Sequence, residues 1–187
     1  MKAKRATIGI KSKTGRGIAV ALAAPLEFIC REELTLCDQK TRQPYHDVME
    51  LPWSESIVAV KPAIATIEKI AARELRRLIR NVESRGYEVV SIGVVGPADR
   101  QLERIGSPHI RAHATEGVLF RAVLETATKA NRIESKSFEN PAEALTAKEK
   151  KTIGDMGKIA GSPWRAEEKS AAMAACAMLT QRRSSAR

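Results

Sequence analysis

The chain of 187 residues has an ordinary globular composition, with 43% hydrophobic and 29% charged residues, which excludes a wholly disordered or collagen-like protein. Its formal net charge of +10 favours a polyanionic partner such as nucleic acid, although solubility alone accounts for a basic chain equally well. The first six and the last six residues each carry three basic residues and no acid, so we expect basic, flexible ends at 1–6 and 182–187.

Membrane and disulfide chemistry are not expected. No apolar run approaches the ~20 residues of a membrane helix, and the first residues lack the apolar core of a secretory signal. We therefore expect a cytoplasmic protein with no membrane partner. Cys30, Cys37 and Cys176 form no CxxC pair, which favours free thiols over a disulfide framework or a cysteine zinc site.

The first third of the chain is typical of a meander of three strands. Residues 7–11 and 18–23 are short apolar runs separated by turn residues at 14–17. Residues 27–36 alternate apolar and polar side chains. Because the connections are short, we expect these three strands to pair antiparallel.

The longest helix is expected after a loop at 38–53. Ser54 is the expected N-cap, and Pro62 either kinks the helix or marks its true start, with residues 54–61 as a separate turn. One apolar stripe follows the steps of three and four that a helix requires. Its members are Ile57, Val60, Ile64, Ile67, Ala71, Leu75, Leu78 and Val82.

The second half alternates strands and helices. The nearly all-apolar run at 88–95 indicates a central strand, and a helix at 110–130 and a strand at 132–138 follow it. A polar segment at 140–161 precedes an alanine-rich helix at 163–182. Three antiparallel strands followed by this alternation predict an α/β domain with a mixed five-stranded sheet, covered by helices, whose later strands run parallel to the first. We expect one domain over the whole chain.

This element order resembles that of the ribonuclease H-like superfamily. Residues 7–21 read TIGIKSKTGRGIAVA, which looks like the first hairpin of the Holliday-junction resolvases of the RuvC and YqgF kind. The strand end VVGP at 94–97 and the alanine-rich last helix resemble the same proteins. The resemblance implies a ribonuclease H-like fold that acts on nucleic acid.

The departure from these nucleases falls on their catalytic acids. They resemble one another in holding two divalent metal ions with several carboxylates, the first of which belongs where this chain has Lys11. An ammonium group repels the metal ions that a carboxylate binds. Glu88 and Asp99 only flank the fourth strand, and Glu167 and Ser170 correspond to the acid pair of the last helix. We therefore expect a nucleic-acid-binding pseudonuclease.

Basic residues in three places are the candidate nucleic-acid contacts. A plain turn and a solvated helix face are the alternative explanations for them. The hairpin could instead cradle the phosphate of a nucleotide, as the equivalent hairpin does in the actin and sugar-kinase branch of this fold, in a protein expected to form a homodimer. The candidate phosphate-binding residues are Lys11, Ser12, Lys13, Thr14, Arg16, Arg73, Arg77 and Arg111.

His109, His113 and Glu116 form a second candidate site. On a helix they share one face, and two imidazoles with a carboxylate can hold zinc or another divalent metal ion with an open coordination position. They could also supply a general base beside a phosphate, or merely cap and pack the start of the helix.

The alternative function is thus a metal-dependent nuclease or hydrolase. Its catalytic residues would be His109, His113, Glu116 and Glu167. Tyr45 and His46 would approach this site if the 38–53 loop crosses the same sheet edge.

Overall fold

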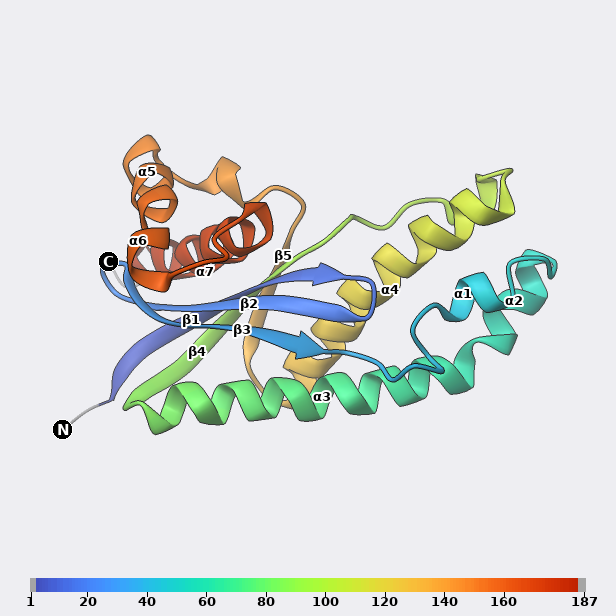
Figure 1. Cartoon of the computed structure of the whole chain (residues 1–187), viewed down its shortest axis with the longest axis horizontal. Coiled ribbons are helices and arrows are strands. Elements are labelled where there is room, and N and C mark those ends of the chain that lie inside the picture. Colours follow the sequence, from blue (N-terminus) through green and yellow to red (C-terminus); the bar gives the residue numbers. More distant parts are fainter. Residues whose placement is uncertain (1–2, 185–187) are drawn as a thin grey trace.

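The computed structural model describes residues 3–184, with side chains over residues 3–180. A five-stranded sheet in the order β3-β2-β1-β4-β5 forms its centre (Figure 1). β1, β2 and β3 pair antiparallel, whereas β4 runs parallel to β1 and β5 parallel to β4, so the predicted mixed sheet is confirmed. The strands are β1 (Lys4–Lys13), β2 (Arg16–Ala23), β3 (Glu27–Thr35), β4 (Tyr87–Val95) and β5 (Glu134–Phe138).

The N-terminal strand is longer than expected. Lys4 pairs with Tyr87 and Ala6 with Val89, so the expected flexible end is wrong for residues 4–6. Their backbone groups are satisfied by β4, which the local sequence pattern could not show. Residues 1–2 and 185–187 of the two expected flexible ends lie outside the described residues.

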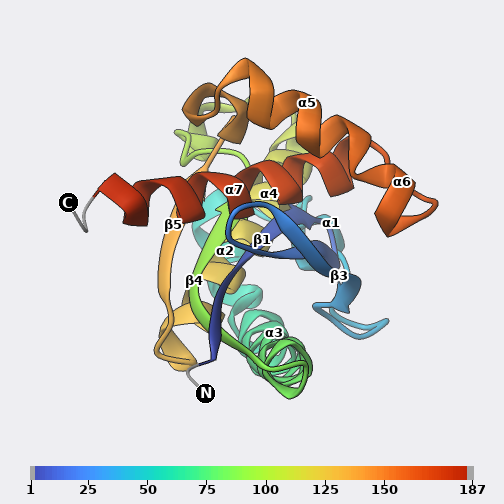
Figure 2. The same cartoon turned by 90° about the vertical axis from the view of Figure 1, so that its left-hand side faces the viewer.

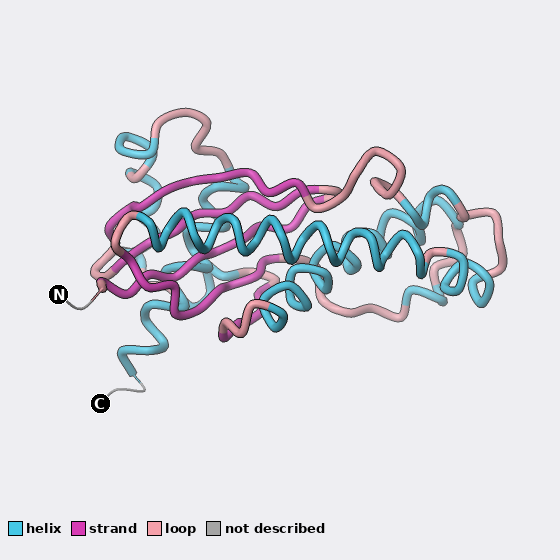
Figure 3. Tube along the Cα trace, turned by 90° about the horizontal axis from the view of Figure 1, so that it is seen from below, coloured by secondary structure: helices cyan, strands magenta, loops and turns pink. Residues whose placement is uncertain are grey.

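Helices cover both faces of the sheet. α3 (Lys61–Ser84) and α4 (Pro108–Ala130) lie on one face, and α7 (Ala166–Ser184) crosses the other (Figure 2). α3 runs along the strands and continues past the end of the sheet (Figure 3). The shorter helical elements are α1 (Pro44–Asp47), α2 (Trp53–Ala59), η1 (Leu102–Arg104), η2 (Pro141–Ala144), α5 (Ala147–Asp155) and α6 (Gly157–Ala160).

Each face of the sheet has its own apolar core. Within α3 the predicted stripe is buried, and residues such as Ile67 and Leu75 share one apolar cluster with Ile8 and Ile10 of β1. Its first member, Ile57, lies in α2 and is 41% exposed, so the prediction of a buried stripe is wrong at that position. On the opposite face, alanines of α7 pack on β2 in a second cluster. No helix in the described part of the chain is both long and apolar enough to span a bilayer.

Small residues bring α7 unusually close to β1. A Cβ atom placed on Gly9 would lie 1.8 Å from the carbonyl oxygen of Ala171 and 2.6 Å from the amide nitrogen of Ala175. Thr7, two residues earlier, donates its hydroxyl hydrogen to the Ala175 carbonyl at 2.8 Å. The middle of β1 is therefore docked directly on the backbone of α7.

The starts of α3 and α7 can each be traced to particular residues. Pro62 is the second residue of α3 and follows a separate helix, α2, so it marks the start of the long helix. α7 begins at Ala166 and not at Pro163, because Trp164 donates from its indole nitrogen to the Ile153 carbonyl at 2.9 Å, outside the helix. Glu168 accepts from the amide of Arg165 at 2.8 Å and so caps the helix at its observed start.

Candidate nucleic-acid interface and histidine cluster

The end of the β1–β2 hairpin gathers basic side chains on the α7 face. Alternation along β1 places Lys11 and Lys13 on the same face as Gly9, toward α7. Ser12 lies on the other face, where it is buried and donates to the Val95 carbonyl at 3.0 Å. Ser12 therefore secures the hairpin to β4, while the two lysines remain accessible to a ligand.

Glu167, in the first turn of α7, faces this basic hairpin. Its Oε1 lies 2.8 Å from Lys13 Nζ, and its Oε2 lies 3.5 Å from an Arg16 guanidinium nitrogen. Arg16 also pairs with Glu33 at 2.8 Å. Burial and the neighbouring charge of Lys13 lower the pKa of Lys11, an effect that Glu167 partly offsets. One carboxylate thus faces three basic groups, and positive groups of this kind attract a phosphate.

We expect Glu167 to make stability depend on pH. The hydrogen bond from Lys13, followed by the charges of Lys13 and Arg16, lowers the pKa of Glu167 from its ordinary 4.5. The stabilisation is therefore complete above pH 4.5 and is lost as the pH falls through the lower folded-state pKa. In urea unfolding, Glu167→Gln should cost roughly 0.5–1 kcal/mol at about pH 6 and little at about pH 3. An equal cost at both pH values would contradict this ion pair.

The other predicted phosphate contacts lie away from Lys13. Arg73 and Arg77 are on α3, across the sheet from α7, and Arg77 pairs with Glu32 at 2.8 Å and with Glu74 at 3.2 Å. Arg111 lies near the start of α4, where its guanidinium stacks 5.7 Å from the ring centre of Trp53. The structure therefore brings together only the hairpin members of the predicted set other than the buried Ser12. They include Thr14, which lines a cleft beside Arg16.

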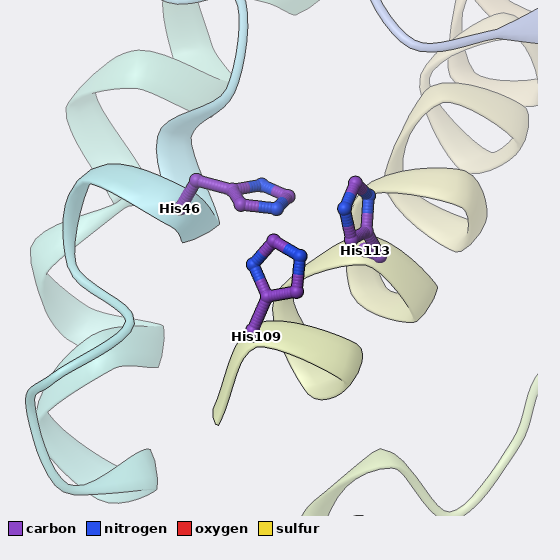
Figure 4. Close-up of side chains that lie close together, drawn as sticks. All are labelled: His46, His109 and His113. Carbon is purple, nitrogen blue, oxygen red and sulfur yellow. The ribbon is translucent and has the colours of Figure 1, made fainter. Parts of the chain in front are cut away.

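The second candidate site is a cluster of all three histidines of the chain. His109 and His113 lie one turn apart near the start of α4, and His46 of α1 faces them (Figure 4). The ring centroid of His46 is 5.4 Å from that of His109 and 4.3 Å from that of His113. One ligand nitrogen from each residue lies within 4.8 Å of the other two. Within residues 3–180, no other group of three or more histidine, cysteine or acidic side chains comes close enough to share an ion.

Glu116 lies behind this cluster. Its carboxylate is fully buried, with Oε1 3.0 Å from Nδ1 of His46. The same oxygen accepts a hydrogen bond from the His46 amide at 3.3 Å. Glu116 thus holds the backbone of His46 and lies beside its ring, and α1 is secured to α4.

His46 belongs to this cluster, although the sequence analysis did not include it among the predicted metal ligands. The sequence predicted that His46 approaches the α4 histidines only if the 38–53 loop crosses the same sheet edge. In the structure His46 does lie beside them. The sequence signal for this site is the small number of histidines. The chain of 187 residues has only three, and all three meet in one place. The contact of Glu116 with His46 had no such signal.

The sheet order, its mixed strand directions and the helices on both faces define a ribonuclease H-like fold. The structure is similar to that of Thermus thermophilus RuvC in complex with a Holliday junction substrate, with 12% identity, a TM-score of 0.53 and 96% of each chain covered. It is also similar to a second Thermus thermophilus RuvC structure, with 10% identity, a TM-score of 0.52 and again 96% of each chain covered. The fold that the first hairpin implied is therefore confirmed. Neither a protein-family model nor a curated protein matches the sequence.

Proposed function

We propose that this protein binds nucleic acid through the β1–β2 hairpin and lacks the two-metal carboxylate site of the resolvases it resembles. The observation that carries the proposal is the group formed by Lys11, Lys13 and Arg16 around one carboxylate, Glu167. The basic hairpin lies at the end of a domain whose fold is that of RuvC, and one of the similar RuvC structures is bound to a Holliday junction. Positive groups in this position attract the phosphate backbone of a nucleic acid.

Salt-dependent binding tests the proposal. We expect the fluorescence anisotropy of a labelled four-way junction, duplex, single-stranded DNA or RNA to rise when the protein binds it. The affinity of the protein for the nucleic acid should fall as the salt concentration rises. The double variant Lys11→Ala/Lys13→Ala should reduce the slope of log K against log salt by about 1.8 for duplex, because two phosphate contacts are lost. Gel analysis of the same samples with Mg²⁺ or Mn²⁺ should show uncut strands.

A matched control removes the same charge elsewhere. Lys69→Ala/Lys129→Ala deletes two exposed lysines on α3 and α4 and should leave the salt slope almost unchanged. An equal loss in both double variants would show a general charge effect with no role for the hairpin. Salt-insensitive binding, or no binding of any nucleic acid, would reject the proposal, and cleavage that depends on Glu167 would reject its pseudonuclease part.

The convergence of the histidines favours a second candidate function, that of a metal-dependent nuclease or hydrolase. Cleavage that disappears in His109→Asn while binding persists would support it over the first. A nucleotide-binding protein is the third candidate, supported by the cleft of about 240 Å³ that Thr14, Arg16 and Arg42 line beside the hairpin. A rise in melting temperature with nucleotides, without affinity for longer nucleic acids, would favour that function.

A further inference from the structure

The two imidazole nitrogens of His46 are buried without hydrogen-bond partners in the described part of the chain. Nδ1 lies 3.0 Å from Glu116 Oε1 but is not aligned with it as a donor. Leaving buried polar atoms unpaired is unfavourable, so such atoms in a native structure require an explanation.

The arrangement of the other two imidazoles supplies that explanation. His109 and His113 are exposed, and their ring centroids lie 4.5 Å apart. Together with His46 they offer three nitrogen ligands from one helix and one neighbouring segment. Neutral imidazole is a preferred ligand of zinc and of related divalent transition metals, and three protein ligands with one open position are a common zinc arrangement.

We propose that His46, His109 and His113 bind one divalent transition-metal ion, zinc, with the fourth position open to water. Nitrogen ligands of a tetrahedral zinc ion lie about 3.3 Å apart, given Zn–N distances of about 2.0–2.1 Å. The three histidine nitrogens, within 4.8 Å of one another, therefore need only side-chain rotations to close on an ion. Two of the rings are exposed, which leaves a path for the metal to enter.

Glu116 supports the site as a positioning residue. A carboxylate that accepts the second N–H of a metal-bound imidazole fixes the tautomer and orientation of the ring. Nδ1 of His46 lies 3.0 Å from Glu116 Oε1, so a rotation of the ring that aligns this hydrogen bond would leave Nε2 for the metal. The carboxylate is fully buried and its Oε2 has no hydrogen-bond partner, so a nearby dication would also offset its charge. His46 thus takes the ligand position that the sequence pattern assigned to Glu116.

The site is independent of the nucleic-acid proposal. Its ligands come from α1 and α4 and include no residue of the β1–β2 hairpin. A bound ion would cross-link the short helix α1 to α4 and so fix the 38–53 segment in place. Failure of either proposal therefore leaves the other standing.

Zinc binding by untagged protein tests the site. After dialysis against a chelator, titration with Zn²⁺ alone, followed by calorimetry, should show one saturable site per chain, and the melting temperature should rise with zinc. His109→Asn and His113→Asn should each weaken binding by about 100-fold or more, because a ligand is removed at an exposed position that the core does not use. Glu116→Gln should weaken binding by about 10–100-fold without abolishing it, as expected of a positioning residue.

Cys37→Ser provides the control. The Cys37 thiol is buried close enough to Glu116 to feel its charge, yet it is absent from the proposed ligand set. This variant should bind zinc as the unmodified chain does, with circular dichroism confirming that every variant is folded. Zinc binding unchanged in both asparagine variants, no saturable site in the unmodified chain, or loss of zinc only in Cys37→Ser would each overturn the proposal.

Discussion

Gly9→Val is expected to lower the free energy of unfolding by about 3 kcal/mol or more, or to prevent folding altogether. The first side-chain carbon would lie 1.8 Å from the Ala171 carbonyl oxygen and 2.6 Å from the Ala175 amide nitrogen. Both contacts are with helix backbone, which cannot rotate away as a flexible side chain can. The only relief is to move α7 off the sheet, and this movement would open the core between them. Urea unfolding followed by circular dichroism measures the loss.

Gly154→Ala is the control for this substitution. Gly154 lies within α5, and a Cβ atom added there meets no atom within 4 Å. Alanine should therefore stabilise the helix by roughly 0.5–1 kcal/mol through its better helix propensity. A Gly9→Val protein as stable as the unmodified chain would show that α7 does not pack directly on β1.

Features that depend on local pattern were predictable from the sequence. The stripe of α3 repeats at the helical period, and Pro62 interrupts it where the long helix begins. The nearly all-apolar run at 88–95 predicted a central strand, and β4 lies between β1 and β5. The alanines of the last helix likewise indicated close packing, and Gly9 is the residue of β1 that makes this closeness possible.

Features that depend on distant segments were not predictable in the same way. Lys4 belongs to β1 only because Tyr87 lies beside it. Arg77 and Lys13 both looked like phosphate contacts, but only the assembled sheet shows that they lie on opposite faces. His46 sits in a segment without period, so its contact with Glu116 could not be read from spacing.

Reversing the charge of Lys13 should have the largest effect on nucleic-acid binding. Lys13→Glu removes one phosphate contact, adds a repulsive charge and leaves two carboxylates side by side at the hairpin, because Glu167 lies 2.8 Å from the Lys13 ammonium. We expect affinity for duplex or junction DNA to fall by about 100-fold or more near physiological salt. Anisotropy titration with circular dichroism as a fold check measures the change. Unchanged affinity would exclude Lys13 from the interface.

A variant in which Lys13 and Glu167 exchange their charges tells nucleic-acid binding by the hairpin apart from metal-dependent cleavage by Glu167. Lys13→Glu/Glu167→Lys restores the ion pair and the net charge of +10, so binding should return to within about 10-fold of the original affinity. Phosphates respond chiefly to the positive charge of the hairpin, whichever strand or helix carries it. A nuclease that uses the Glu167 carboxylate would instead bind the strands and lose cleavage in this variant, since a lysine cannot replace a carboxylate ligand. If the swap restores the fold but not binding, the Lys13–Glu167 pair is a structural contact and the interface lies elsewhere.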